Sequence, residues 1–209
     1  IICQGLHNIV SIGSRCKIIN RHNKIIYAEV VGMEDQKVSL MPFTDPEGIG
    51  VGCVVEVSQK QSMIYPHKSW LGRIINAFGQ PIDNKGSLAV GDIGYPIKNN
   101  PPPAHKRQRV KDKIDLGVKS LNSFVSCCAG QRLGIFAGSG VGKSMLIAML
   151  TKFSDIEIKV IGLIGERGRE VQEFIQEYLG EEGLKNTVII VATSDESALM
   201  RIQASYLTM

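Results

Sequence analysis

The sequence lacks long hydrophobic runs and any local excess of charge. No uninterrupted apolar stretch approaches the roughly 20 residues that a membrane-spanning helix needs, and no signal peptide opens the chain. The formal charge of +4 is spread evenly, because residues 1–104 and residues 105–209 each carry +2. This balance excludes a polycationic arm and gives little reason to expect a nucleic-acid partner. We therefore expect a cytoplasmic protein.

Cysteines with the spacing of metal ligands are also missing. The five cysteines are odd in number, and none is placed as in a zinc site. Cys127 and Cys128 are adjacent and could form a redox pair, but small buried residues are the favoured interpretation. Reduced thiols agree with a cytoplasmic protein.

Aromatic residues make up only 6% of the sequence. The candidates for stacking RNA bases in the first half are Tyr27, Phe43, Tyr65, Trp70 and Phe78. None belongs to a motif that interleaves aromatic and basic residues, as binding of single-stranded RNA requires. This absence argues against an RNA translocase.

The most informative stretch that is present is glycine-rich. Residues 137–144 read Ala-Gly-Ser-Gly-Val-Gly-Lys-Ser, between an apolar run at residues 133–136 and a helical pattern at residues 143–153. Such a turn could merely connect two elements, but strand, loop and helix N-terminus in this order typify a phosphate-binding loop. Lys143 would supply positive charge, and the Ser144 hydroxyl would ligate Mg²⁺ directly. The candidate nucleotide-binding residues are Ala137, Gly138, Ser139, Gly140, Val141, Gly142, Lys143, Ser144 and Met145.

Residues 1–95 predict a small N-terminal β-barrel and a connecting segment. Short runs rich in Val, Ile and Tyr alternate with turn signals, which is typical of antiparallel β-structure. Strands are expected at residues 16–20, 25–32, 37–42, 54–58 and 72–76, with hairpin loops at residues 20–23 and 33–36. Residues 79–86 form a double turn, for which connection is favoured over a role in binding.

Residues 96–111 are proline-rich and basic and form the expected linker. Beyond it, residues 112–209 predict the first part of a P-loop NTPase domain. Strands are expected at residues 133–136, 156–165 and 187–193, and helices at residues 114–125, 143–153 and 171–179. Asp195 would be the N-cap of a final helix. Strands that alternate with helices predict a parallel sheet, so the fold class is α/β.

Charged residues follow the strand expected at residues 156–165, at the sheet edge where open α/β folds bind their ligands. Glu166 would orient and polarise an attacking water. Arg167 would neutralise charge on a transferred phosphoryl group, and Glu170 would hold a water of the Mg²⁺ shell. The alternative is that these charges form ordinary i, i+3 and i, i+4 pairs on an exposed helical turn. We favour the chemical role.

Several separated motifs support that choice. The loop at residues 137–144 and Gly-Glu-Arg-Gly-Arg-Glu-Val from Gly165 are accompanied by Trp-Leu-Gly-Arg at 70–73, Gly-Gln-Pro-Ile-Asp at 79–83, Asp-Leu-Gly-Val-Lys at 115–119 and Ala-Thr-Ser-Asp-Glu at 192–196. In this order they resemble the rotary ATPase superfamily of F- and V-type subunits, and within it the flagellar and type III secretion protein-export ATPases. The resemblance implies a small β-barrel followed by a RecA-like P-loop domain.

The resemblance also implies an Mg²⁺-dependent ATPase that couples ATP hydrolysis to protein export. By resemblance, Lys143 contacts the β- and γ-phosphates and Ser144 ligates Mg²⁺. Glu166 corresponds to the catalytic carboxylate, and Arg167 to an arginine beside the γ-phosphate. Members of this family form hexameric rings, work with stalk or regulator proteins, chaperones and secreted substrates, and associate peripherally with an export gate at the inner membrane.

We expect the chain to be a fragment, since it begins with Ile1 and stops at Met209 inside a helical pattern. By resemblance, the second acidic motif, the interface arginine and a C-terminal helical domain would follow, so this piece should bind nucleotide weakly and hydrolyse little. The alternatives are a catalytic subunit of a proton-coupled F- or V-type ATPase, a Rho-like RNA translocase, and a non-enzymatic, nucleotide-gated assembly module. By resemblance, an amide would be expected in place of Glu166 in a non-catalytic ring subunit, and Gly168 with Val171 favours the export branch.

Overall fold

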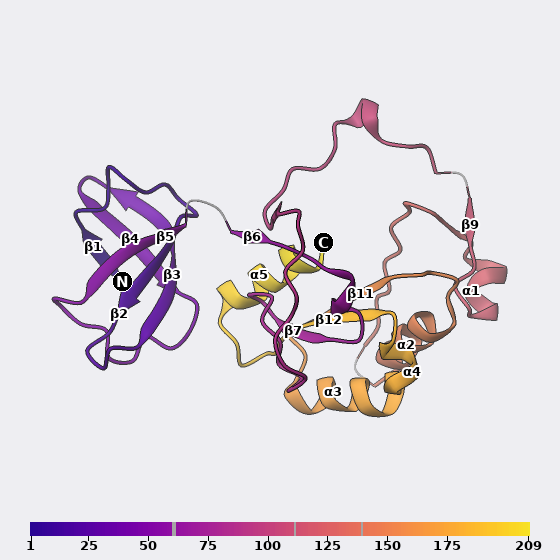
Figure 1. The fold of residues 1–209 in the computed structure, drawn as a ribbon. Helices are drawn as coiled ribbons and strands as arrows, with labels where there is room; N and C mark the ends of the chain where they lie inside the picture. Colours follow the sequence, from indigo (N-terminus) through magenta and orange to yellow (C-terminus); the bar gives the residue numbers. More distant parts are fainter. Residues whose placement is uncertain (60–61, 111, 139) are drawn as a thin grey trace.

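The computed structural model describes residues 1–59, 62–110, 112–138 and 140–209. An antiparallel sheet lies beside a second part in which helices pack on a parallel sheet (Figure 1). Ser139 of the expected phosphate loop and Lys111 of the expected linker lie outside the described residues. The longest helices within the described ranges have 11 residues, too few to cross a membrane.

The first part is a five-stranded antiparallel sheet in the order β1-β4-β3-β2-β5. Side chains alternate between its faces, so Cys16 and Ile18 are fully buried while the residues between and beside them are not. The strands expected at residues 16–20, 25–32, 37–42 and 54–58 are confirmed. A short strand, β1, was not predicted. The strands are β1 (Ile2–Gln4), β2 (Arg15–Ile19), β3 (Ile25–Glu34), β4 (Lys37–Pro42) and β5 (Val54–Gln59).

Both expected hairpin loops are present. The Asn20 side-chain oxygen accepts hydrogen bonds from the backbone N–H groups of His22 and Lys24 at 3.0 and 2.9 Å. Asn23 in this loop and Asp35 in the second loop have positive φ angles of 59° and 50°. Asn and Asp adopt this left-handed conformation more readily than other side chains, which explains their place in the turns.

The second part is built on a three-stranded parallel sheet in the order β11-β12-β7. Ile189 at its centre pairs with Ile161 on one side and Ile74 on the other. The strand expected at residues 72–76 therefore exists, but its assignment to the antiparallel structure is wrong. Partners distant in sequence decide which sheet a short strand joins. The strands are β7 (Ile74–Asn76), β11 (Lys159–Ile164) and β12 (Thr187–Ala192).

Helices cover both faces of the parallel sheet, as burial of such sheets requires. On one face, α2, α3 and the π-helical turn η3 pack against Leu163 and Ile189. On the other face, Met200 and Ala204 of α5 pack beside Ile190. The helices of the two layers are α2 (Lys143–Phe153), α3 (Gly168–Glu173), η3 (Phe174–Leu179), α4 (Gly180–Leu184) and α5 (Ala198–Thr208).

The remaining elements are short. Residues 98–110 follow β8 and form an arch that stands away from the rest of the second part (Figure 1). The short elements are β6 (Met63–Ile64), η1 (Lys68–Trp70), β8 (Tyr95–Pro96), η2 (Ala104–Lys106), β9 (Lys113–Ile114), α1 (Lys119–Phe124) and β10 (Cys127–Cys128).

Residues 133–136 do not form the expected buried strand. Leu133 is 41% exposed and Phe136 is 98% exposed. No strand of the described residues pairs with them, and β11 forms an edge of the parallel sheet. An extended segment becomes a strand only where a neighbouring backbone takes up its hydrogen bonds. The apolar run therefore has no regular structure in this chain.

Two helix predictions are corrected as well. Instead of a helix over residues 114–125, β9 pairs with β10, and only α1 between them is helical. The final helix is capped by Ser197, whose hydroxyl accepts a hydrogen bond from the N–H of Met200 at 3.2 Å. Asp195 is not the N-cap, because α5 begins at Ala198. The elements expected at residues 143–153, 156–165, 171–179 and 187–193 are present.

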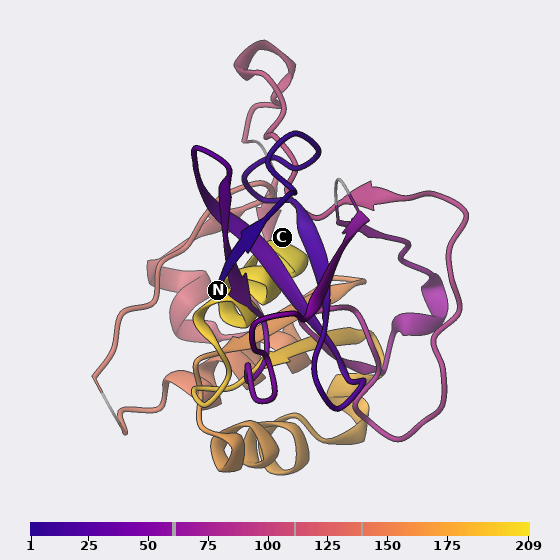
Figure 2. The same cartoon turned by 90° about the vertical axis from the view of Figure 1, so that its left-hand side faces the viewer.

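Ser197 also joins the two parts of the molecule. Its hydroxyl donates a hydrogen bond to the carbonyl of Phe43 at 2.7 Å. The Phe43 ring packs edge-on against Phe78 with centroids 5.1 Å apart, and it belongs to the same buried cluster as Trp70 and Ile75. The antiparallel sheet accordingly lies in front of α5 when the molecule is viewed from that side (Figure 2).

Candidate nucleotide-binding site

The backbone of the glycine-rich loop is not covered by other atoms where it leads into α2. Gly140 and Gly142 have φ angles of 76° and 95°, in the left-handed region that favours glycine. No atom lies within 4 Å of the position that a Cβ would take at Gly138, Gly140 or Gly142. Within the described residues no side chain caps α2. The N–H groups of its first turn and its dipole are thus available to an anion.

Lys143 and Glu166, far apart in sequence, are neighbours in space. Lys143 Nζ donates a hydrogen bond to Glu166 Oε1 at 3.2 Å, and the two side chains are 41% and 35% exposed. Lys143 is the first residue of α2, and Glu166 follows the end of β11. An ion pair this exposed contributes roughly 0–1 kcal/mol. A phosphate group can therefore compete for the ammonium.

Backbone hydrogen bonds to the end of β12 hold Glu166 at this edge. Gly165 has a φ of 77°, and its N–H donates to the carbonyl of Ala192 at 2.7 Å. The N–H of Ser194 donates to the carbonyl of Glu166 at 2.9 Å. The carboxyl ends of two parallel strands thus hold the carboxylate on the edge where ligands bind. The sequence analysis missed Ser194, although its place after a predicted strand was a usable signal.

Asp195 is a second carboxylate at the same edge. Hydrogen bonds from the Thr193 hydroxyl, and then from the backbone N–H of Asp195 itself, hold the pKa of the Asp195 carboxyl below its usual range. The group is therefore ionised at neutral pH. The sequence analysis considered Asp195 as a helix cap and as part of the motif at residues 192–196, although its position after β12 also indicates the sheet edge that carries Glu166.

Arg167 and Glu170 pair with each other. Arg167 Nη1 lies 3.7 Å from Glu170 Oε1, and the side chains are 68% and 42% exposed. This is the ordinary i, i+3 pairing of a helical turn. No ion pair of the described residues joins either side chain to α2. Ser144 and Met145 lie in the first turn of α2, with Met145 53% exposed.

Few protein side chains at this sheet edge could coordinate a metal ion. Over the described ranges, no three His, Cys, Asp or Glu residues converge on one point. Mg²⁺ usually keeps several waters and takes one or two protein ligands plus substrate phosphates, so the single Ser144 hydroxyl suits it. Together with the open glycine backbone and Lys143, this donor set fits a nucleoside triphosphate with Mg²⁺.

Two protein-family models match the chain. The ATP synthase alpha/beta family, nucleotide-binding domain, matches residues 117–209, and the ATP synthase alpha/beta family, beta-barrel domain, matches residues 3–58. The flagellum-specific ATP synthase of Caulobacter vibrioides is 54% identical over 96% of this chain and 45% of its own length. The flagellum-specific ATP synthase of Bacillus subtilis is 43% identical over 94% of this chain and 45% of its own length.

A solved structure has the same fold. The assembled ATPase EscN of the type III secretion system of enteropathogenic E. coli matches with a TM-score of 0.84 and 34% identity, over 95% of this chain and 47% of the EscN chain. EscN in complex with its central stalk EscO matches with a TM-score of 0.85. The chain thus spans about half the length of the relatives it matches. The two matched domains and these relatives show that the chain belongs to the ATP synthase alpha/beta family.

Proposed function

We propose that the protein represented by this chain hydrolyses ATP with Mg²⁺ and uses the energy to export proteins through a flagellar or type III secretion apparatus. The observation that carries the proposal is the 3.2 Å contact between Lys143 of the glycine-rich loop and Glu166 at the end of β11. The export context comes from relatives named flagellum-specific ATP synthase and from the type III secretion ATPase EscN.

In this proposal the loop and the first turn of α2 hold the phosphates through backbone N–H groups. Lys143 leaves Glu166 and contacts the β- and γ-phosphates, while the Ser144 hydroxyl is the direct protein ligand of Mg²⁺. The metal ion, when bound, neutralises charge on the phosphate oxygens. Glu166, released from its ion pair, orients and polarises the attacking water. Ser194 keeps the backbone of Glu166 in place during this exchange.

Arg167 and Glu170 would exchange partners in the same way. A bound triphosphate attracts the Arg167 guanidinium, which then neutralises charge on the transferred phosphoryl group. Glu170 is released to hold a water of the Mg²⁺ shell. Their 3.7 Å separation and high exposure make the present pair weak enough to break.

For the complete protein we propose a homo-hexamer that lies peripherally at an export gate of the inner membrane. Its partners would be a stalk or regulator protein, chaperones and secreted substrates. The assembled state of EscN and its complex with a central stalk support an assembly and a stalk partner.

Binding of a fluorescent ATP analogue tests the loop. Lys143→Met should weaken binding to this chain by roughly tenfold or more, because a charge-assisted contact to phosphate is lost. Lys152→Met, at the exposed other end of α2, is the matched control and should bind like the wild type. Equal affinities of all three chains would contradict the assignment of the loop.

Phosphate release tests Glu166. In the full-length protein, Glu166→Gln should lower turnover by roughly 100-fold or more while ATP binding persists, because an amide cannot act as the base. This chain alone should turn over little, and rates typical of ATPases would show that it needs no further residues. Stimulation of the full-length protein by single-stranded RNA would favour a Rho-like translocase, and proton pumping would favour the F- or V-type alternative.

A further inference from the structure

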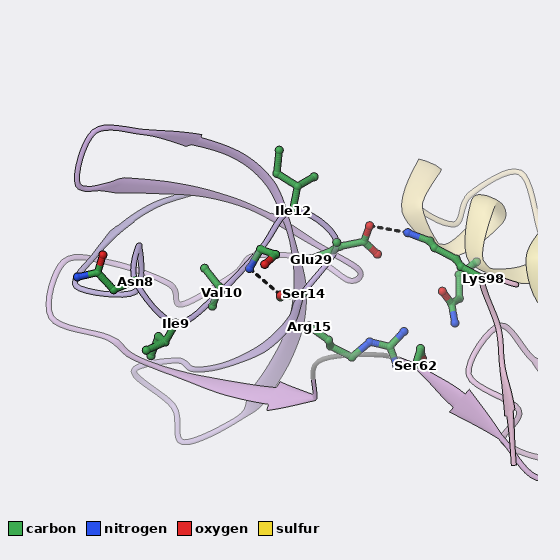
Figure 3. A pocket seen from close by; sticks show the side chains of 12 residues that line it. Asn8, Ile9, Val10, Ile12, Ser14, Arg15, Glu29, Ser62 and Lys98 are labelled. Carbon is green, nitrogen blue, oxygen red and sulfur yellow. Dashed lines mark hydrogen bonds and ion pairs between the residues drawn. The ribbon is translucent and has the colours of Figure 1, made fainter. Parts of the chain in front are cut away.

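A cleft of about 670 Å³ separates the antiparallel sheet from the second part of the molecule. Its wall on one side is the segment 8–14 between β1 and β2, together with Arg15 and Glu29 of the sheet. Lys98 lies on the other side (Figure 3), and Gln203, which belongs to α5, also lines the cleft. None of these residues belongs to the glycine-rich loop or to the edge that carries Glu166, so the cleft is a separate site. Its size is that of pockets that bind small molecules.

The cleft carries one net positive charge, since it holds two cationic side chains and one carboxylate. Lys98 Nζ lies 2.9 Å from Glu29 Oε1 (Figure 3), and that carboxylate is only 15% exposed. The pair is therefore largely self-compensating, and Arg15 supplies the remaining charge. In the described part of the chain, no carboxylate lies within ion-pair distance of Arg15.

Two aromatic rings hold the guanidinium of Arg15 without satisfying its N–H groups. Its central carbon lies 5.1 Å from the ring centroid of Phe43 and 5.1 Å from that of Phe78. Ring faces attract the cation, but the five N–H donors of a guanidinium lie in its own plane and need acceptors there. Burial lowers the pKa of Arg15 from its usual value, and the Glu29 carboxylate offsets this only in part, which agrees with a charge that lacks full solvation.

A second polar group points to a missing ligand. Gln203 is 3% exposed, and its side-chain nitrogen has no hydrogen-bond partner among the described residues. A buried amide without a partner is unfavourable unless a bound molecule supplies one. Gln203 and Arg15 reach the cleft from opposite walls, so one acceptor-bearing ligand can serve both.

Two large apolar side chains also line the cleft. Ile9 and Ile12 line it and are 61% and 70% exposed. Exposed aliphatic side chains in the same cleft as the Arg15 cation suit a molecule with an acidic head and an apolar body. The single net positive charge of the cleft favours a singly charged carboxylate over a doubly charged phosphate, and the planar guanidinium of Arg15 can bind a carboxylate through two parallel hydrogen bonds.

We propose that this cleft binds a small organic carboxylate, with its carboxylate group on Arg15 and Gln203 and its apolar body on Ile9 and Ile12. Because the ligand would touch β2 on one side and α5 on the other, it would brace the antiparallel sheet against the nucleotide-binding part.

The test uses 4-fluorobenzoate as the probe and ¹⁹F NMR to follow its binding to this chain. A dissociation constant of about 1 mM is expected for a fragment of this size, with a shift of the Gln203 side-chain NH₂ signal in a ¹⁵N spectrum. The uncharged 4-fluorobenzamide should bind at least about tenfold more weakly, because it lacks the charge-assisted hydrogen bonds.

Single substitutions test whether 4-fluorobenzoate binds in the cleft. Arg15→Gln should weaken binding by about tenfold or more, and Ile12→Ser, at an exposed position that folding does not need, by about threefold. Lys17→Gln, two residues along β2 and outside the cleft, is the matched control and should bind like the wild type. Absence of binding, equal binding by Arg15→Gln and the wild type, displacement by equimolar inorganic phosphate, or loss of binding in Lys143→Met would each overturn the proposal.

Discussion

Replacing Asp83 by Asn should destabilise the fold strongly. Asp83 lies in the double turn at residues 79–86, and its side chain is 2% exposed. Its carboxylate accepts two hydrogen bonds from Arg73, at 2.7 Å from Nε and 2.9 Å from Nη2. It also accepts the backbone N–H groups of Ile74 and Lys85, each at 3.1 Å. These bonds tie the turn to Arg73 and to β7, an edge strand of the parallel sheet, so the turn is more than a plain connection.

The expected loss in the free energy of unfolding follows from these four hydrogen bonds. Asn keeps one acceptor oxygen but presents an NH₂ group to donors, so at least one buried N–H loses its partner. Breaking one side of a buried ion pair costs roughly 3–5 kcal/mol, and a hydrogen bond to a charged group contributes roughly 1.5–3 kcal/mol. We expect Asp83→Asn to lower the free energy of unfolding by about 3 kcal/mol.

The same contacts set a pH dependence. The hydrogen bonds from Arg73, and then those from the backbone, hold the pKa of Asp83 well below its usual range. The folded pKa of Asp83 is lower than its unfolded pKa, so the stabilisation is fully present above the unfolded value of about 4. It is lost as the pH falls through that value toward the depressed folded pKa. The difference between the wild type and Asp83→Asn should accordingly shrink below about pH 4.

Urea unfolding followed by circular dichroism at neutral and acidic pH measures both effects. Asp45→Asn is the matched control, because exposed Asp45 accepts one backbone hydrogen bond, from Glu47 at 3.0 Å, that Asn can keep. It should change the unfolding free energy by less than about 0.5 kcal/mol. A loss below about 1 kcal/mol for Asp83→Asn, or a loss that stays constant with pH, would refute the reasoning.

Three further predictions concern stability and the site. Gly117→Ala should lower the free energy of unfolding by roughly 3 kcal/mol, because a Cβ there would lie 2.2 Å from backbone atoms of α2 at a φ of 70°. Gly130 has a similar φ of 78° but open space around it, so Gly130→Ala should cost only about 1 kcal/mol in the same urea unfolding experiment. Ser197→Ala should cost about 1–2 kcal/mol in urea unfolding, since the hydroxyl both caps α5 and bonds the antiparallel sheet, and an unchanged midpoint would contradict both roles. Glu166→Gln should leave the melting temperature of this chain within about 2 °C, because its pair with Lys143 is exposed, and a larger drop would mean that the pair stabilises the fold.

Local patterns predicted much of this molecule correctly. Alternation placed the strands at residues 16–20 and 37–42 because one face of each is buried and the side-chain period is two. The loop at residues 137–144 has the open glycine backbone at the start of α2 that its sequence predicted, and its role in binding phosphate stays a prediction. Glu166 followed from a topological rule, since the ends of parallel strands meet at one edge.

The mistaken secondary-structure predictions share one physical cause. Contacts between segments distant in sequence decide which strands pair and where a helix begins, and the local sequence does not contain them. Residues 72–76 read as a strand, but only the position of β12 makes it a parallel partner. Residues 133–136 are as apolar as a buried strand, yet no described neighbour accepts their hydrogen bonds. Asp195 is a good cap by residue type, but α5 starts where Ser197 reaches the antiparallel sheet.

The sequence by itself predicted a phosphate-binding loop from residue types at fixed spacing, and it placed Glu166 at the same sheet edge because the ends of parallel strands meet there. Only the tertiary structure decided that Lys143 and Glu166 lie 3.2 Å apart, that Ser194 holds the backbone of Glu166, and that Arg15 faces a cleft. These arrangements join segments distant along the chain, and packing of the sheets and helices alone sets the distances between them.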